Sequence, residues 1–240
     1  MKSQYILPIT IVVAGALIAG AVFLAGKSST PDGNNNGKPP TVRAYTPGVD
    51  HILGNPNAPV KVVEYMDLEC AHCKVFHTTM HQIMAYYGAS GKVAWVERPF
   101  PLSQIHSKAV QEAHAAECAA AQGGDTAYFA YTDKVFEITP SNNGLDLAEL
   151  PKIAQEIGLN ITAFNTCMSE GKYNDKISAS YNEAIAAGGQ GTPYTFIMVG
   201  TETVVLNGAQ PYDSMRAAID SVLGDLGTPV TPSLSTTTTQ

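Results

Sequence analysis

The pattern of apolar and polar positions predicts an α/β domain that begins with a strand, a helix and a second strand. Residues 60–66 form an apolar, β-branched run that is typical of a buried strand. A helical pattern then extends over residues 75–87, and residues 92–97 predict the second strand. Strands and helices therefore alternate in the first half of the predicted domain.

A block of helices is expected next, because several segments are rich in alanine or repeat their apolar residues at helical spacing. These segments are residues 107–122, 125–137, 145–157, 161–169 and 173–187. The Gly-Thr-Pro segment at 191–193 ends the helical pattern, and two short strands are expected at 194–199 and 203–206. With a last helix at 211–223, the order becomes βαβ, a helical block, then ββα.

The two ends of the chain differ from this globular pattern. Residues 6–26 carry no charge and are nearly all apolar or small, a stretch long enough to span a bilayer. We therefore expect residues 1–26 to be an uncleaved transmembrane signal anchor; the alternative is a cleaved signal peptide, with small residues suited to cleavage at 19–21. Residues 27–50 are rich in Gly, Asn and Pro and predict a flexible linker, and the Thr/Ser/Pro-rich tail at 225–240 is expected to be disordered.

Residues 51–224 remain, which is enough for one domain with a sizeable core. The net charge of the chain is −7, and the sequence contains no basic stripe and no Gly-rich phosphate loop. These features argue against a nucleic-acid partner. The four cysteines of the chain are more informative than its charge.

Cys70 and Cys73 form a Cys-x-x-Cys motif between the first predicted strand and the first predicted helix. This layout is typical of a thiol–disulfide redox site. The spacing brings both sulfurs to the first turn of one helix, where they can bond or separate with little backbone change. The free N–H groups and the dipole at the helix N-terminus favour a thiolate at Cys70, and the thiolate is the attacking species.

His72 lies between the two cysteines, where its N–H or positive charge would stabilise the Cys70 thiolate and so favour the reduced protein. The alternative is a solvent-facing histidine without a role. The motif itself has another interpretation, a structural disulfide or half of a zinc site, since His77 and His81 follow Cys73 at helical spacing. We expect no metal, because the helix face that carries Cys73 should pack on the sheet.

Five segments, in their order along the chain, resemble the DsbA-like branch of the thioredoxin superfamily. They are LGNPNAPV, VVEYMDLECAHC, ERPFPL, AAECAAAQGG and GTPYTFIMVG. The resemblance covers about residues 51–224 and implies an α/β thioredoxin fold, βαβ…ββα, interrupted by an all-helical insertion at about residues 103–189. Ala71 departs from the family pattern, because many members have proline at this position.

The resemblance also implies roles for single residues. Cys70 would exchange with substrate sulfurs, and Cys73 would resolve the mixed disulfide. Glu64 would lie beneath the site and help to move the proton of Cys73. Pro193 would follow Thr192 through a cis peptide bond, and Thr192 would offer backbone contacts to an extended substrate. From the residues alone, Glu64 could instead face water at the sheet edge, and Pro193 could belong to an ordinary turn.

Cys118 and Cys167 both fall on predicted helices of the insertion, and nothing beside Cys118 would activate its thiol. We interpret the pair as a structural disulfide that closes a long loop, with two buried free thiols as the alternative. Because disulfides persist in oxidising compartments, the cysteines favour a domain outside the cytoplasm.

The sequence thus predicts a single-pass protein of the cell membrane with an extracytoplasmic thiol–disulfide oxidoreductase domain. The Cys70–Cys73 disulfide would be donated to exported proteins with cysteine pairs, and a membrane partner would reoxidise the enzyme. No organic cofactor is expected. The first alternative is a reductase or isomerase with the same fold, and the second is a non-catalytic binding or assembly module.

Overall fold

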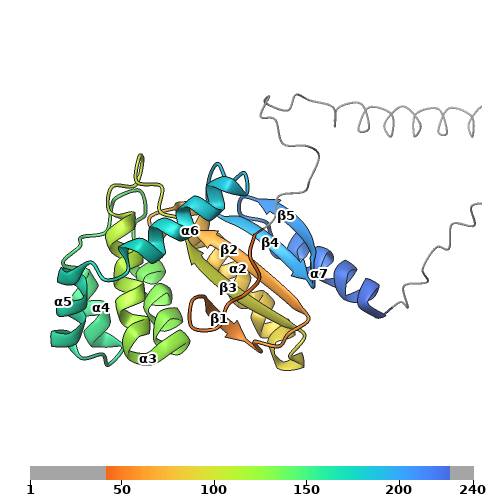
Figure 1. Ribbon diagram of the computed structural model, residues 1–240, viewed down its shortest axis with the longest axis horizontal. Coiled ribbons are helices and arrows are strands. Elements are labelled where there is room, and N and C mark those ends of the chain that lie inside the picture. Colours follow the sequence, from red (N-terminus) through yellow and green to blue (C-terminus); the bar gives the residue numbers. More distant parts are fainter. Residues whose placement is uncertain (1–41, 228–240) are drawn as a thin grey trace, which may run out of the picture. The chain divides into compact units, whose positions relative to one another are not determined.

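The computed structural model describes residues 42–227, which contain a five-stranded mixed sheet (Figure 1). The strands are β1 (His51–Gly54), β2 (Val60–Met66), β3 (Val93–Pro99), β4 (Tyr194–Val199) and β5 (Glu202–Asn207). Their order in the sheet is β1-β3-β2-β4-β5, in which β2 and β3 are parallel and the other neighbours are antiparallel. The predicted α/β class is therefore confirmed.

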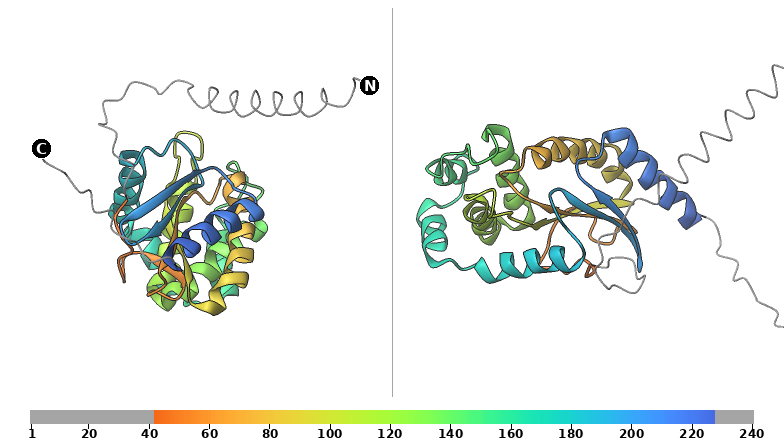
Figure 2. Two further views of the ribbon diagram at one scale, coloured as in Figure 1. Left: turned by 90° about the vertical axis from the view of Figure 1, so that its right-hand side faces the viewer. Right: turned by 90° about the horizontal axis from the view of Figure 1, so that it is seen from above.

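The helices cover both faces of the sheet and one of its ends. They are α2 (Ala71–Tyr87), α3 (Ala109–Ile138), α4 (Glu149–Glu156), α5 (Ile161–Glu170), α6 (Asn174–Ala186) and α7 (Tyr212–Gly227), with a short 3-10 helix at Gly88–Ser90. Helices α2 and α7 lie on one face and α6 on the other, as the view from above in Figure 2 shows. Helices α3, α4 and α5 pack together beyond one end of the sheet and, with α6, form the predicted insertion between β3 and β4.

Strand β2 contributes to two cores because successive side chains of a strand point to opposite faces. Val60 and Val62 are fully buried in the core beneath α2 and α7, whereas Val63 and Tyr65 are fully buried in the core beneath α6. Glu64 follows the alternation of Val60 and Val62. Its carboxyl group is therefore directed toward the α2 face of the sheet.

Strand β1 is not predicted by the sequence, because four residues are too few to display a period-2 pattern. It pairs with β3 in antiparallel register, with Leu53 opposite Trp95. Gly54 ends the strand at a φ of +104°, and a Cβ added there would lie 2.8 Å from the Met84 side chain and 3.2 Å from the Val93 carbonyl oxygen. Only glycine fits this close approach without displacing its neighbours.

Helix α3 joins the two helices that the sequence predicts at 107–122 and 125–137. The predicted break is nevertheless present, since Gly123 has φ −140° and ψ 15° and Gly124 has φ 62° and ψ −152°, both outside the helical region. The chain thus forms two helical halves that meet at a kink.

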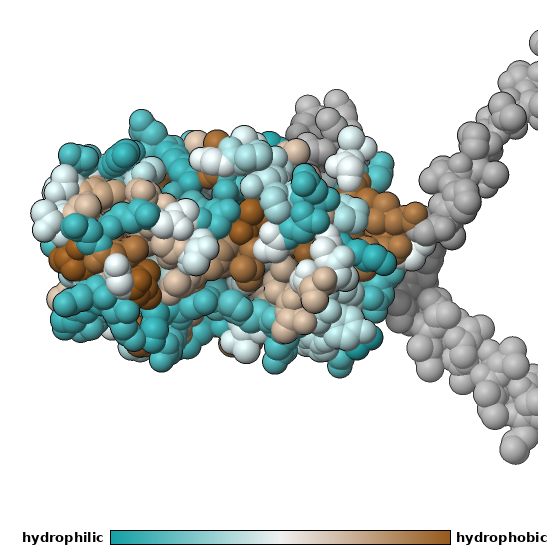
Figure 3. Space-filling model, turned by 90° about the horizontal axis from the view of Figure 1, so that it is seen from below, coloured by the Kyte–Doolittle hydropathy of each residue, from teal (hydrophilic) through white to brown (hydrophobic). Residues whose placement is uncertain are grey.

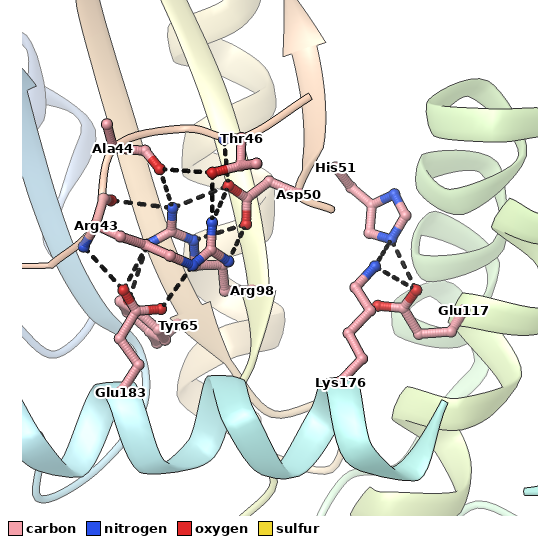
Figure 4. A network of polar contacts seen from close by, with 10 residues as sticks. All are labelled: Arg43, Ala44, Thr46, Asp50, His51, Tyr65, Arg98, Glu117, Lys176 and Glu183. Carbon is pink, nitrogen blue, oxygen red and sulfur yellow. Dashed lines mark hydrogen bonds and ion pairs between the residues drawn. The ribbon is translucent and has the colours of Figure 1, made fainter. Parts of the chain in front are cut away.

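The linker predicted at 27–50 extends too far, because residues 42–50 belong to the folded domain. Asp50 is buried and accepts hydrogen bonds from the Arg98 guanidinium at 2.9 and 3.0 Å, which Figure 4 shows. Arg98 also donates to the carbonyl oxygen of Arg43 at 3.2 Å. A buried guanidinium needs such partners. The segment before β1 supplies them, which its Gly- and Pro-rich composition does not reveal.

Helix α6 is tied to the rest of the domain by two polar clusters (Figure 4). In the first, a Glu183 oxygen accepts the backbone N–H of Arg43 at 2.8 Å. In the second, one oxygen of Glu117 lies 2.6 Å from the Lys176 ammonium and 3.0 Å from Nε2 of His51. The second cluster joins α6, α3 and β1, and so links the sheet to the helical insertion.

The predicted signal anchor at 1–26 lies outside the described residues, as does most of the tail predicted at 225–240. Helix α7 continues to Gly227, so the first residues of that tail are helical rather than disordered. Within residues 42–227, no helix combines the length and the apolar character needed to cross a membrane. On the face drawn in Figure 3, polar residues surround separate apolar patches.

Candidate active site

Cys70 and Cys73 lie where the chain passes from β2 into α2. Cys70 is the residue before the helix, with extended backbone angles, and Cys73 lies in its first turn. Both are free thiols; Cys70 is 7% exposed and Cys73 is fully buried. A partner molecule would therefore reach the sulfur of Cys70 first.

The loop before Cys70 is held in place by the buried carboxylate of Asp67. One oxygen accepts the backbone N–H of Glu69 at 2.8 Å. The other accepts the backbone N–H of Leu102 at 2.8 Å and lies 2.8 Å from Nδ1 of His106. Because these partners come from the loop itself and from the chain after β3, Asp67 fixes the approach to the motif.

Thr192 and Pro193 lie against Cys70, although more than a hundred residues separate them in the sequence. The peptide bond between Thr192 and Pro193 is cis. Sγ of Cys70 lies 3.4 Å from the carbonyl oxygen of Thr192, to which Cys70 donates a hydrogen bond when it is a protonated thiol. The resemblance of this segment to the family thus identified the residues that face the motif, and the ordinary-turn alternative is excluded.

The pKa of the Cys70 thiol is lowered to about 5. The largest cause is the hydrogen bond from the Cys73 thiol, and burial opposes it. The Thr192 side chain and the backbone N–H groups of Cys73 and His72 lower the pKa further. Cys70 is therefore a thiolate at neutral pH, stabilised by the first turn of α2 as expected for a helix N-terminus.

The alkylation rate of the reduced protein by iodoacetamide should report this shift directly. We expect the rate to rise with pH around a midpoint near 5 and to be level above pH 7, because the thiolate is the reacting species. Mass spectrometry of the modified peptide would assign the reaction to Cys70, since Cys73 is buried and the other two cysteines are disulfide-bonded. A midpoint near 8.5, the value of an ordinary cysteine, would contradict the geometry.

The environment of Cys73 and Glu64 favours protonated groups. Burial, followed by the contact with Cys70, raises the pKa of the Cys73 thiol well above its usual value. Burial and the nearby charge of Glu97 raise the pKa of Glu64, whose carboxyl group accepts the indole N–H of Trp95 at 3.0 Å. Glu64 is 1% exposed, so the alternative that it faces water is wrong. Burial thus favours the protonated form of the Glu64 carboxyl group.

Glu97 and His77 extend this buried group; the sequence analysis names His77 only as a possible zinc ligand and does not identify Glu97 as a site residue. Glu97 lies opposite Glu64 in the parallel register of β2 and β3, and its carboxylate lies 3.3 Å from Nδ1 of His77. Burial lowers the pKa of His77, but the carboxylates of Asp133 and Glu97 outweigh it and raise the pKa to about 9. The imidazolium thus compensates the acids under the motif. The available sequence signal for this group was Glu97, a second glutamate that interrupts an apolar strand.

A second acidic pair, Glu69 and Glu112, lies behind the motif. Burial, followed by the contact with Glu69, raises the pKa of Glu112 to about 9, so Glu112 favours its protonated form. Glu69 also accepts backbone N–H groups from Asn142 and Asn143, which belong to the turn after α3. The residue before Cys70 is thereby fastened to the insertion, a link that sequence spacing does not reveal.

The side chain of His72 is exposed, and its backbone N–H is the group that affects the Cys70 thiol. The stabilising role expected for its imidazole stays a prediction. Among the described residues, the one cluster of potential metal ligands with free side chains is His77, His81 and Asp133. It contains neither Cys70 nor any other thiol, which disfavours a zinc site at the motif.

Cys118 and Cys167 are joined by a disulfide bond, with 5.8 Å between their Cα atoms. The bridge connects α3 to α5 and thus lies within the helical insertion. The alternative of two free thiols does not hold. Nε2 of His114 lies 3.8 Å from the Cys118 sulfur, a contact with the bridge.

Two comparisons with known proteins agree with this geometry. A family model described as thioredoxin matches residues 46–221, most of the chain. The crystal structure of Pseudomonas aeruginosa DsbA2 is 26% identical with a TM-score of 0.63, and the alignment covers 76% of this chain and 99% of that one. This chain belongs to the DsbA-like branch of the thioredoxin superfamily. A second DsbA-like structure, α-DsbA1 of Wolbachia pipientis, is 28% identical with a TM-score of 0.65, covering 75% and 94% of the two chains.

The DsbA-like chain is also similar to part of a much longer protein. The Na(+)/H(+) antiporter NhaA 1 of Mycolicibacterium gilvum is 28% identical over 158 residues, which are 65% of this chain but 24% of the antiporter. The chain therefore spans about a quarter of the length of the curated relatives it matches. The similarity concerns a segment of the antiporter and not the whole protein.

Proposed function

We propose that the chain is an extracytoplasmic thiol–disulfide oxidoreductase that donates the Cys70–Cys73 disulfide to exported proteins. The observation that carries the proposal is the contrast between the two sulfurs. The pKa of the accessible Cys70 thiol is about 5, while the pKa of the buried Cys73 thiol is raised. Strong stabilisation of one thiolate favours the dithiol over the disulfide, which makes the disulfide form an oxidant.

The reaction begins when a substrate thiolate attacks the sulfur of Cys70. A substrate–Cys70 disulfide forms, the Cys70–Cys73 bond breaks, and Cys73 leaves with the electron pair. We assign to Glu64 the supply of the proton that the buried Cys73 sulfur needs, because both groups are buried and the charge of Glu64 raises the pKa of Cys73. A second substrate thiolate then attacks the substrate sulfur of the mixed disulfide and releases Cys70 as a thiolate. The low pKa of Cys70 makes it a good leaving group, and the substrate gains one disulfide.

Exposed apolar side chains beside the motif support a protein substrate. Val75 is 63% exposed in the first turns of α2, and Ile105 is 64% exposed after β3. Ile138, at the end of α3, is 42% exposed and precedes Thr139, whose carbonyl oxygen accepts a hydrogen bond from Lys74. Apolar residues gathered around a reactive group are typical of a surface that binds a polypeptide. The carbonyl group of Thr192 adds a backbone contact for an extended segment.

The location and the reoxidising partner are part of the same proposal. The uncharged stretch at 6–26 suits a membrane anchor, and the Cys118–Cys167 bridge is a kind of bond that persists in oxidising compartments. Each turnover leaves Cys70 as a thiolate and Cys73 as a thiol. A membrane partner must therefore accept two electrons, and one proton leaves Cys73, before the next cycle.

The redox potential of the full-length protein tests the direction of the reaction. We would equilibrate it with defined ratios of reduced and oxidised glutathione and follow the Cys70–Cys73 disulfide. A potential less negative than about −180 mV, the level of protein disulfide isomerase, supports a disulfide donor. A potential near or below about −270 mV, the level of thioredoxin, would instead support the reductase alternative.

A further inference from the structure

Two histidines of α2 and one aspartate of α3 direct their side chains at a common point. His77 and His81 are four residues apart and lie on one face of α2. Oδ1 of Asp133 lies 2.7 Å from Nε2 of His77 and 2.8 Å from Nε2 of His81. The two Nε2 atoms are 3.2 Å apart. Three potential ligand atoms thus converge, two from α2 and one from α3.

A buried carboxylate orients the first of these histidines. Oε1 of Glu97 lies 3.3 Å from Nδ1 of His77, and Glu97 itself is 1% exposed. Among the described residues, neither the Glu97 oxygens nor Nδ1 of His77 has a hydrogen-bond partner, so this contact is an ion pair without hydrogen-bond geometry. When a metal ion displaces the Nε2 proton of this imidazolium, the nearby carboxylate favours the tautomer whose remaining proton is on Nδ1, so the Nε2 lone pair can bind the ion. This is the outer-shell arrangement typical of metal-binding histidines.

The three side chains line a pocket of about 480 Å³ that opens to solvent. The side chains of His81 and Asp133 are 40% and 43% exposed, so an ion can enter without unfolding the domain. Glu137, one helical turn after Asp133, also lines the pocket. Water or this exposed carboxylate can complete the coordination.

We propose that His77, His81 and Asp133 bind a divalent transition-metal ion, with Zn²⁺ as the best match to the ligand set. Two imidazole nitrogens and one carboxylate oxygen suit Zn²⁺, whereas Ca²⁺ and Mg²⁺ prefer oxygen ligands alone. Tetrahedral Zn²⁺ with bonds of about 2.0–2.1 Å separates neighbouring ligand atoms by about 3.3 Å. The ligand atoms are now 2.7–3.2 Å apart and need to move apart by about 0.1–0.6 Å.

The ion would connect the two parts of the domain beside the redox motif. Helix α2 begins at the motif, and α3 begins the helical insertion. Cys73, His77 and His81 follow one another at four-residue spacing on α2. A metal bridge from this face to Asp133 would stabilise the junction of α2 and α3.

Zinc titration of the full-length protein tests the site. The protein is first treated with a chelator and kept with the Cys70–Cys73 bond oxidised, so that no thiolate competes for metal. Isothermal titration with Zn²⁺ should then give one equivalent per chain. His81→Ala and Asp133→Asn should each weaken binding by at least about tenfold, the effect seen even for outer-shell residues. Co²⁺ should give the visible absorption bands of a four-coordinate site.

His72→Ala is the matched control, because it removes an imidazole of the same helix that lies outside the cluster. It should leave the Zn²⁺ affinity unchanged. Circular dichroism would verify that the variants fold, which we expect since His81 and Asp133 are both partly exposed. Absence of binding to the wild type, or binding that survives both ligand substitutions, would overturn the proposal. The three side chains would then form an ion-paired cluster without a metal.

Discussion

Replacing Cys70 with serine is expected to lower the rate of disulfide exchange by more than about a thousandfold. Cys70 is the accessible sulfur of the motif, and its thiolate is stabilised by the start of α2 and by the Cys73 thiol. A serine hydroxyl at the same place is neither a comparable nucleophile nor able to form the mixed disulfide. The measurement is the oxidation of a peptide with two cysteines, followed by mass spectrometry.

Cys73→Ser is the informative partner of this variant. It leaves the Cys70 thiol in place but removes the group that resolves the mixed disulfide. When it is incubated with the disulfide form of the peptide, its Cys70 thiolate should attack that disulfide and release one peptide thiol, so that a mixed disulfide accumulates and is detected by non-reducing electrophoresis. Cys70→Ser should form none. If the wild type oxidised the peptide no faster than Cys70→Ser, the chain would be a binding module that uses the fold as a scaffold.

The parts of the site that the sequence predicts are those encoded by local patterns. The apolar run of β2 is continuous in the sequence, and Cys70 and Cys73 adjoin it, so strand, motif and helix can be placed without tertiary information. Thr192 and Pro193 are found in another way. Their position opposite the motif follows from the family resemblance, since nothing in their local sequence refers to Cys70.

The parts that the sequence does not predict depend on long-range contacts between charged groups. Glu97 is identified as a strand residue, but its position beside Glu64 follows from the parallel register. The role of Asp133 requires the packing of α3 against α2, which brings it to His77. Such groups are spaced widely along the chain and have no periodic signal. Their burial is favourable only because each finds a partner of opposite charge or a proton.

Removing the bridge with Cys118→Ala and Cys167→Ala is expected to lower the free energy of unfolding by about 4 kcal/mol, because the bond closes a loop over a sequence separation of 49. The loss arises in the unfolded chain, which gains the conformations that the bridge forbids. Urea unfolding of both proteins under oxidising conditions measures the difference. The same measurement shows whether the stability of the helical insertion, which is distant from the redox motif in chain order, depends on the disulfide bond.

The reduced wild type is the control for this comparison, since it keeps every side chain and loses only the bonds. In excess reductant, wild type and double variant should therefore unfold at nearly the same urea concentration, with Cys70 and Cys73 as thiols in both. A double variant that remains less stable than the reduced wild type would show that side-chain packing at the buried Cys118 contributes as well. A loss below about 1 kcal/mol under oxidising conditions would contradict the loop-closure argument, because even short closed loops give about 3 kcal/mol.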